Sequence, residues 1–300
     1  MRFNKGEDRP KTGRYITLRG LQPTGSSGEM NPENPLGNTT RYPTEYAPEV
    51  LFAVPREESR AMLLKGAALP FHGTDIWNVW ELSWLDTSGK PIVATAAISV
   101  DAGSTNIVES KSLKLYLNSL AMTRFESTEE IRQVIVGDLA RTVIGDIGVD
   151  IRTATNSTSG SIDQLPGTCI DTQQVSAWSD TVDPAILACN KASVVAEELH
   201  SHLLRSNCPI TDQPDTGSIL IRYKGPKIEE ASLLRYLVSF RRHNDFHEAC
   251  VERIFLDIRN RCATRALTVY ACYNRRGGID INPYRTDTHD APAHLRLWRQ

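Results

Sequence analysis

The sequence repeats one order of secondary structure, strand–strand–helix–helix–strand, in its two halves. Alternating apolar residues predict strands, and apolar residues three and four positions apart predict helices. The first copy has strands at 76–85, 92–100 and 147–153, with helices at 111–121 and from 127 onward. The second copy has strands at 194–204, 218–223 and 265–273, with helices at 228–241 and 243–261. This order predicts an α+β fold of two tandem units, each an antiparallel sheet with two helices packed on one face.

Local patterns support these elements. In the first hairpin, Trp80, Leu82 and Trp84 alternate and are expected to share one face. Ser127 with Glu130 forms a capping box at the start of a helix.

We place the units at 49–165 and 166–300. Residues 1–48 are rich in Gly, Pro, Asn and Thr, so we expect a flexible or extended lead-in.

Composition excludes several classes of protein. The net charge is −2 with both signs interspersed, which argues against direct binding of DNA or RNA. The sequence contains no apolar run long enough to cross a bilayer and no apolar stretch near the N-terminus that would indicate a secretory signal. We therefore expect a cytoplasmic protein that contacts neither membrane nor nucleic acid directly.

Cys208 and Asp215 are the first candidates for chemistry. Six cysteines occur without a Cys-x-x-Cys pair, so a zinc ribbon or thioredoxin-type motif is not indicated. Pro209, Pro214 and Gly217 disfavour a continuous strand and favour a folded-back connection that brings the thiol to the carboxylate. A thiol beside a carboxylate can act as nucleophile and proton donor. A structural cysteine and an ordinary turn aspartate remain the alternative.

Two carboxylates could recognise a ligand. His247 and Glu248 share the inward side of the last helix, so the fold or a ligand must supply partners for a buried Glu248. Glu109 precedes a helix carrying Lys111 and Lys114, where an acid could simply stabilise the positive helix end.

One cationic turn could bind an anion. Arg275 and Arg276 precede two glycines, which makes the turn a candidate phosphate clamp or an exposed basic turn. A Gly-x-Gly-x-x-Gly fingerprint is absent from the sequence, so a dinucleotide would not be held in Rossmann fashion.

The histidines do not complete a metal site at this level. His243 with His247, and His200 with His202, have the spacing of paired ligands, but the sequence places no third ligand near either pair. We therefore expect no metal.

Taken together, these motifs resemble the NADPH-dependent 7-cyano-7-deazaguanine reductases, nitrile reductases of the tunnelling-fold (T-fold) superfamily. The resemblance covers roughly residues 65–300 and is similar to the two-module form of the family. It rests on Leu69-Pro-Phe-His-Gly-Thr-Asp-Ile-Trp77, Glu109-Ser-Lys-Ser-Leu-Lys-Leu-Tyr-Leu-Asn-Ser119, Ser201-His-Leu-Leu-Arg-Ser-Asn-Cys208, Leu234-Arg-Tyr-Leu-Val-Ser-Phe240, Phe246-His-Glu-Ala-Cys-Val-Glu-Arg-Ile-Phe255 and Arg275-Arg-Gly-Gly-Ile-Asp-Ile-Asn-Pro283.

The resemblance implies a reaction and roles for residues. Two NADPH would reduce the nitrile to an aminomethyl group, and the product would enter the biosynthesis of queuosine in tRNA. The reaction would pass through a covalent thioimide on Cys208, with Asp215 as the proton donor. Position 215, rather than Asp212, has the family's spacing from the thiol. The residues implied to bind the 7-deazapurine are Val108, Glu109, Ser110, His247 and Glu248. Those implied to bind NADPH are Ser110, Lys111, Arg276 and Gly277. A homodimer and no metal are also implied.

Three rival functions remain open at this level. A thiol amidohydrolase or nitrilase would share the cysteine and carboxylate but need no nicotinamide. A purine- or pterin-binding module on the same fold would bind without catalysis. Zinc-dependent cyclohydrolase chemistry is disfavoured because the sequence shows no evident set of Cys and His ligands.

Overall fold

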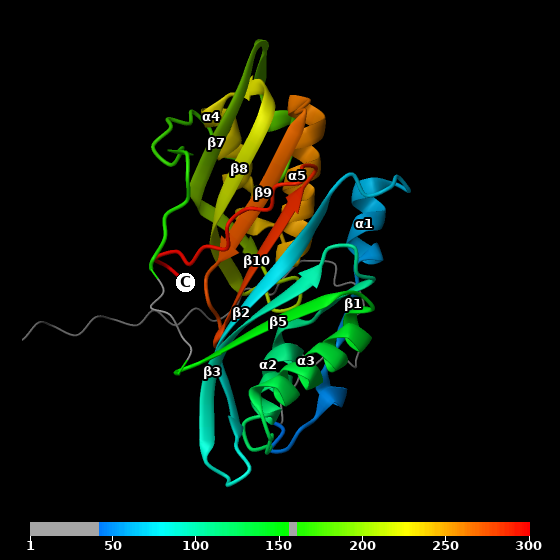
Figure 1. Ribbon diagram of the computed structural model, residues 1–300. Coiled ribbons are helices and arrows are strands. Elements are labelled where there is room, and N and C mark those ends of the chain that lie inside the picture. Colours follow the sequence, from blue (N-terminus) through cyan, green and yellow to red (C-terminus); the bar gives the residue numbers. More distant parts are fainter. Residues whose placement is uncertain (1–41, 156–160) are drawn as a thin grey trace, which may run out of the picture. The chain divides into compact units, whose positions relative to one another are not determined.

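The alternating segments form one continuous sheet in the computed structural model, which describes residues 42–155 and 161–300 (Figure 1). The strands are β1 (Ala53–Pro55), β2 (His72–Leu85), β3 (Pro91–Asp101), β4 (Asn106–Val108), β5 (Ile147–Thr153), β6 (Thr168–Cys169), β7 (Cys189–Asn207), β8 (Pro214–Ile228), β9 (Ala266–Tyr273) and β10 (Ile279–Thr286). The helices are α1 (Glu57–Leu64), α2 (Ser110–Ser119), α3 (Thr128–Val143), α4 (Glu230–Val238) and α5 (His247–Cys262). The predicted α+β fold, with its repeated element order, is confirmed.

Strand β10 joins the two repeats. The large sheet has the order β5-β3-β2-β10-β9-β8-β7-β6, and β10 pairs antiparallel with both β2 and β9. All its pairs are antiparallel except β6 with β7. The two predicted sheets are therefore halves of one eight-stranded sheet. The repeated sequence pattern did not predict β10, and this strand makes the connection.

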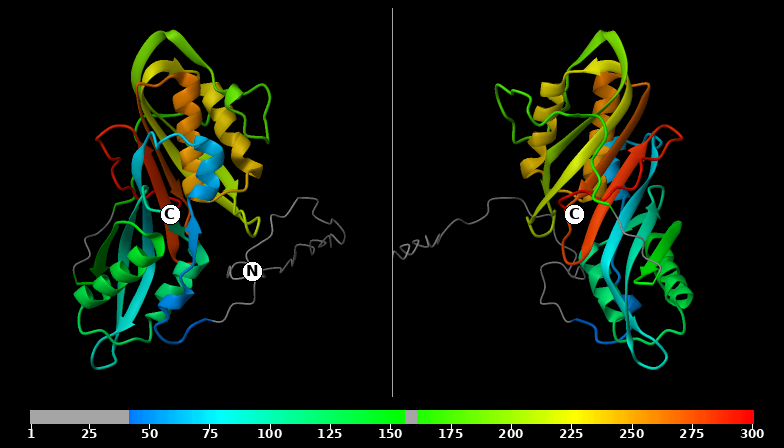
Figure 2. Two further views of the ribbon diagram at one scale, coloured as in Figure 1. Left: turned by 90° about the vertical axis from the view of Figure 1, so that its right-hand side faces the viewer. Right: turned by 60° about the vertical axis from the view of Figure 1, so that its left-hand side comes forward.

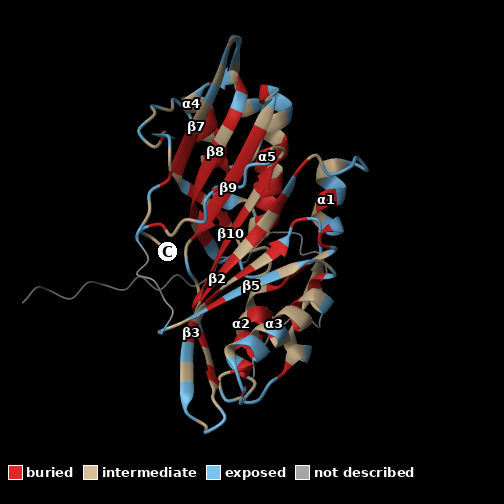
Figure 3. Ribbon diagram, viewed as in Figure 1, coloured by how far each residue is buried: buried red, intermediate tan, exposed pale blue. Residues whose placement is uncertain are grey.

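Both pairs of helices lie on the same face of this sheet (Figure 2). Ile281 packs in the core under α2 and α3, whereas Val269 packs in the core under α4 and α5. Val269 pairs with Arg285, which is four residues from Ile281 on β10 and so shares its face. Figure 3 shows buried residues along the central parts of the strands, and these strands contribute residues to both cores. One side of the sheet thus carries the helices of both repeats.

The first hairpin contains one irregularity that the alternating pattern did not predict. Its turn forms as expected, with Asp86 Oδ1 accepting from the backbone N–H groups of Ser88 and Lys90 at 2.9 and 3.0 Å. The β2–β3 register, however, shifts between Val79 and Leu82, as in a β-bulge. Because an extra residue reverses the alternation, the expectation that Trp80 shares a face with Leu82 and Trp84 was wrong. Trp80 Nε1 instead donates to Asp280 Oδ2 at 2.5 Å.

Helix α3 begins where the capping pattern predicts. The Ser127 side chain accepts from the backbone N–H of Glu130 at 3.1 Å. The Glu130 carboxylate accepts from the backbone N–H of Glu126 at 2.6 Å, one residue before the position that a reciprocal capping box requires. The helix buries Ile131, Ile135 and Leu139 against the sheet.

A buried ion network ties the two halves together on the helix face. Arg285 on β10 binds Asp75 of β2 and Glu252 of α5, each at 2.8 Å. Arg56 binds Asp75 at 2.5 Å, and Arg60 of α1 binds Glu252 at 2.7 Å. All five side chains are at most 9% exposed. Burial removes water from each charged group, so each one depends on its oppositely charged partners to compensate for the lost hydration.

The division into domains stays a prediction. The described residues belong to one unit, residues 35–300. The proposed lead-in, residues 1–48, lies almost entirely outside the described residues. At its described end Ala47 is buried, and Tyr46 Oη donates to Asp138 at 2.7 Å. Within residues 42–155 and 161–300, no helix has the length and apolar character needed to cross a membrane.

Candidate active site

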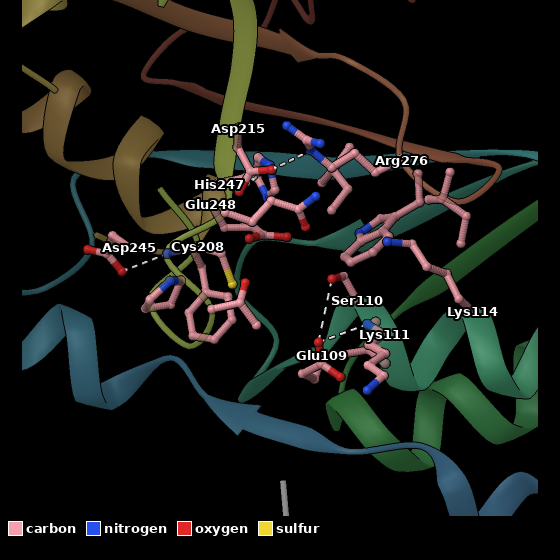
Figure 4. Close-up of a pocket in the computed structure, with 18 of the residues that line it drawn as sticks. Glu109, Ser110, Lys111, Lys114, Cys208, Asp215, Asp245, His247, Glu248 and Arg276 are labelled. Carbon is pink, nitrogen blue, oxygen red and sulfur yellow. Dashed lines mark hydrogen bonds and ion pairs between the residues drawn. The ribbon is translucent and has the colours of Figure 1, made fainter. Parts of the chain in front are cut away.

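Four segments from both repeats meet around a pocket of about 370 Å³ (Figure 4). They are the start of α2, the β7–β8 connection, the first turn of α5 and the β9–β10 turn. The lining includes Trp77, Val108, Glu109, Ser110, Lys111, Lys114, Cys208, Gln213, Asp215, Asp245, Phe246, His247, Glu248, Asn274 and Arg276. Nine of the ten residues predicted for the site line this pocket, and the tenth, Gly277, lies beside Lys114.

The segment after β7 folds back, as its prolines predict. Asn207 pairs with Pro214 and Ser206 with Asp215, so Cys208 stands at the turn of a hairpin. The backbone N–H of Cys208 donates to the Gln213 carbonyl at 2.9 Å. The thiol and the carboxylate of Asp215 both line the pocket.

The Asp215 carboxylate is partly neutralised by the Arg276 guanidinium. Oδ1 lies 3.0 Å from Arg276 Nε, and Oδ2 lies 3.8 Å from His247 Nε2. Asp212, the other acid of this loop, accepts a hydrogen bond from Asn244 and does not line the pocket. The structure therefore places Asp215, and not Asp212, at the pocket with Cys208.

His247 is a neutral imidazole at physiological pH. Burial lowers its pKa to about 4, although Asp215 opposes this shift. Its ring packs edge-on against Tyr273 with centroids 4.0 Å apart. A neutral ring can accept or donate a hydrogen bond in the pocket without adding charge.

Glu109 caps helix α2 with both carboxylate oxygens. Oε1 accepts from the backbone N–H of Lys111, and Oε2 from that of Ser112, each at 2.8 Å. Its side chain is fully buried, and burial raises its pKa against the effect of these hydrogen bonds. The Ser110 hydroxyl also donates to Oε1, at 3.5 Å, so Oε2 is the oxygen that keeps a lone pair for a ligand donor. The capping and recognition roles that the sequence left open are therefore compatible.

Glu248 is a buried acid with an unsatisfied oxygen. It is 3% exposed in the first turn of α5, and its Oε1 has no hydrogen-bond partner among the described residues. Burial, reinforced by the negative charge of Asp75, raises its pKa to about 8. A buried unpaired acceptor costs free energy until a donor reaches it. The pocket opens onto this residue, so a ligand can supply that donor.

Lys114 is a pocket cation that the sequence analysis did not include among the site residues. Burial lowers its pKa, while Glu109, Asp215 and Cys208 favour its charged form. Its position one helical turn after Ser110 is the signal that could have identified it, since residues four apart share a helix face. A side chain at Gly277, where φ is +55°, would contact Lys114.

The spacing of His243 and His247 does not produce a helical ligand pair. Helix α5 begins at His247, and His243 precedes the helix in an extended conformation. His243 Nε2 lies 3.6 Å from Asp245 Oδ2. The i, i+4 geometry assumed for a metal-binding pair is therefore absent here.

The pocket combines a cysteine with a carboxylate partner, buried acids that can read donor groups, and adjacent cations. Two family models match the chain. One, described as the N-terminal part of the nitrile reductase 7-cyano-7-deazaguanine reductase, matches residues 42–151. The other, described as a QueF-like protein, matches residues 214–292. Together they cover well over half of the chain, and Cys208 lies between them. The protein belongs to the two-module 7-cyano-7-deazaguanine reductase family of nitrile reductases.

This membership supports an oxidoreductase connected with queuosine biosynthesis over the hydrolytic and non-catalytic alternatives.

Proposed function

We propose that the protein reduces the nitrile of 7-cyano-7-deazaguanine to the aminomethyl group, using two NADPH, by way of a thioimide on Cys208. The observation that carries this proposal is the convergence of Cys208, Asp215 and the unsatisfied carboxyl of Glu248 on one pocket. The nucleophile and proton donor come from the β7–β8 connection, and the recognition groups come from α2 and α5.

Recognition of the base rests on Glu248 and Glu109. A guanine-like ring presents a ring N–H and an exocyclic amine side by side, which a carboxylate can accept together. Glu248 Oε1 is a buried acceptor in need of such a donor. Val108, Ser110 and His247 complete the wall around the base. A site built on such hydrogen bonds can reject analogues that lack them by up to ~10⁴-fold.

The covalent step begins at Cys208. Its sulfur attacks the nitrile carbon, one π bond of C≡N breaks, and the nitrogen takes a proton delivered by Asp215. The proton released by the thiol restores the acid, so no net charge develops. Expulsion of the sulfur from the later thiohemiaminal returns the electron pair of the C–S bond to Cys208 and leaves an imine. Arg276 holds the Asp215 carboxylate at the pocket throughout.

NADPH would supply the hydrides that convert the thioimide to the thiohemiaminal and the imine to the amine. Each hydride adds to carbon as the C=N π bond breaks, and the nitrogen takes one proton from solvent. Lys111 and Lys114 line the pocket and can meet its phosphates, with Ser110 contacting both ligands. Gly277 leaves space above Lys114 that a Cβ would occupy. Arg276 contributes a guanidinium at the same edge, although it also binds Asp215.

The stoichiometry of NADPH consumption tests this function. Mixing enzyme, nitrile and NADPH should oxidise two NADPH for each nitrile, which is followed by the loss of NADPH absorbance. Cys208→Ala should abolish turnover, whereas Cys189→Ala, a matched change at a cysteine outside the pocket lining, should not. Consumption of the nitrile without NADPH would indicate hydrolysis and refute the proposal.

We also propose a cytoplasmic homodimer. The described sheet ends at β5 and β6, so it has two edges at which another chain can pair. Light scattering should give twice the 33.4 kDa of one chain. The mass of a monomer would contradict the dimer without affecting the proposed reaction.

A further inference from the structure

Three potential metal ligands meet at the β6 edge of the sheet. Cys169 of β6 pairs in register with His200 of β7, and His202 follows two residues later, so the three side chains project on one face. Their ligand atoms all lie within 4.8 Å of one another. Leu199, the residue before His200 on β7, packs into the core under α4 and α5. The cluster therefore occupies the sheet face opposite the helices.

Hydrogen bonds prepare the two imidazoles for coordination. His200 Nδ1 lies 2.9 Å from the Pro166 carbonyl oxygen, which only accepts, so Nδ1 carries the proton and Nε2 keeps its lone pair. His202 Nδ1 lies 2.8 Å from Ser218 Oγ, a hydroxyl that can donate or accept here and that also accepts from Arg299 Nη2 at 3.3 Å. The Nδ1–H of His200, bonded to an oxygen, is the usual outer support of a metal-bound histidine.

We propose that Cys169, His200 and His202 bind a divalent transition-metal ion, with Zn²⁺ as the best chemical match. One thiolate and two neutral imidazoles form a ligand set suited to zinc, and water can take the fourth position. Tetrahedral coordination requires ligand atoms roughly 3.5 Å apart, so small side-chain rotations would close the present spacing. Cys169 is exposed and His200 is 8% exposed, which leaves an entry path for the ion from one side.

The ion would have a structural role. None of the three ligands lines the pocket that contains Cys208. Strand β6 contains two residues and is held to β7 as the terminal strand of the sheet. Coordination would add a cross-link between this short edge strand and β7, stabilising an edge that has little pairing of its own.

Cobalt titration of chelator-treated full-length protein tests the site. A Cys208→Ala background removes the pocket thiol, so a thiolate-to-Co²⁺ charge-transfer band can then be traced to another cysteine. This protein and its Cys189→Ser derivative should bind one Co²⁺ with that band. The Cys169→Ser derivative should lose the band and bind at least tenfold more weakly, and His200→Asn should weaken binding similarly. A band unaffected by Cys169→Ser, or no cobalt binding, would overturn the proposal.

Thermal unfolding provides a second readout. Zinc that binds only the folded state raises Tm in proportion to the logarithm of its concentration above Kd. The parent and Cys189→Ser proteins should show this rise, and Cys169→Ser should not. Because Cys169 is exposed, its replacement should leave Tm without zinc nearly unchanged. An equal zinc-dependent rise in Cys169→Ser would exclude the site.

Discussion

Glutamine at position 248 should make the protein more stable and a poorer binder of its substrate. Glu248 Oε1 is buried without a hydrogen-bond partner among the described residues, and burial together with Asp75 raises the pKa of Glu248 to about 8. Glutamine has nearly the same shape but cannot ionise. The substitution therefore removes the cost of keeping an ionisable acid in a buried site, while it replaces one of the two acceptor oxygens that the base requires with an NH₂ donor.

The size of the stability effect depends on pH. An unfolded glutamic acid has a pKa of 4.5, so the folded state binds more protons than the unfolded state between pH 4.5 and about 8. Glu248 therefore costs no stability below pH 4.5, where it is protonated in both states. The cost grows through this window, in which only the unfolded state ionises, to its full value above pH 8. At ~1.4 kcal/mol per unit, the cost reaches about 3 kcal/mol at pH 7 and stays below about 1 kcal/mol at pH 5.

Urea unfolding at pH 5 and pH 7, at one protein concentration, measures this difference. Glu248→Gln should exceed the wild type in free energy of unfolding by about 3 kcal/mol at pH 7 and by much less at pH 5. Glu58→Gln, at an exposed glutamate, should stay within about 0.5 kcal/mol at both values. A gap that is the same at both pH values, or a less stable Glu248→Gln protein at pH 7, would refute the reasoning.

Calorimetric titration with the nitrile base completes the test. Loss of one of the two acceptor oxygens should weaken binding by roughly 10–100-fold, because a buried donor left without its partner costs ~1–3 kcal/mol. A variant that binds the base as tightly as the wild type would show that Glu248 does not read it, even if the stability effect holds.

Three further substitutions test other parts of the account. Arg285→Met should destabilise the fold by about 3–5 kcal/mol in urea unfolding, because it leaves Asp75 and Glu252 buried with fewer cations; a neutral effect would contradict the network's role. Ser127→Ala should cost about 1 kcal/mol through loss of the α3 cap, and no change would argue against it. Asp215→Asn should lower kcat by roughly 10²–10⁴ in the NADPH assay, whereas full activity would exclude it as proton donor.

The repeated element order was predictable because it depends on local periodicity. The hairpin turn at Asp86 and the strand Ile147–Thr153 appear where the sequence places them. Strand β10 was missed because its alternation is short: Ile279 and Ile281 alternate with Asp280 and Asn282, and Pro283 then interrupts the pattern. A proline inside a run argues against a central strand. The bulge before Leu82 likewise depends on pairing with β3, which no single-strand pattern encodes.

The sequence motifs indicated which residues line the pocket, but they did not indicate which of these residues contact one another. The motif resemblance named nine of the residues that line the pocket, and the expectation that Glu248 would be buried is confirmed. The ion pair of Arg276 with Asp215 joins residues far apart in the sequence. Cys169, the third potential ligand near His200 and His202, also comes from a separate strand. Such contacts follow from strand order, which the sequence pattern alone did not specify.

The central claim is a reversible bond between Cys208 and the nitrile carbon. The direct measurement is the intact mass of the enzyme after incubation with 7-cyano-7-deazaguanine in the absence of NADPH. We expect one adduct with the mass of the added nitrile, mapped to Cys208, that disappears when NADPH is supplied and is absent from Cys208→Ala. An adduct on another cysteine, or full nitrile reduction by Cys208→Ala, would contradict the account.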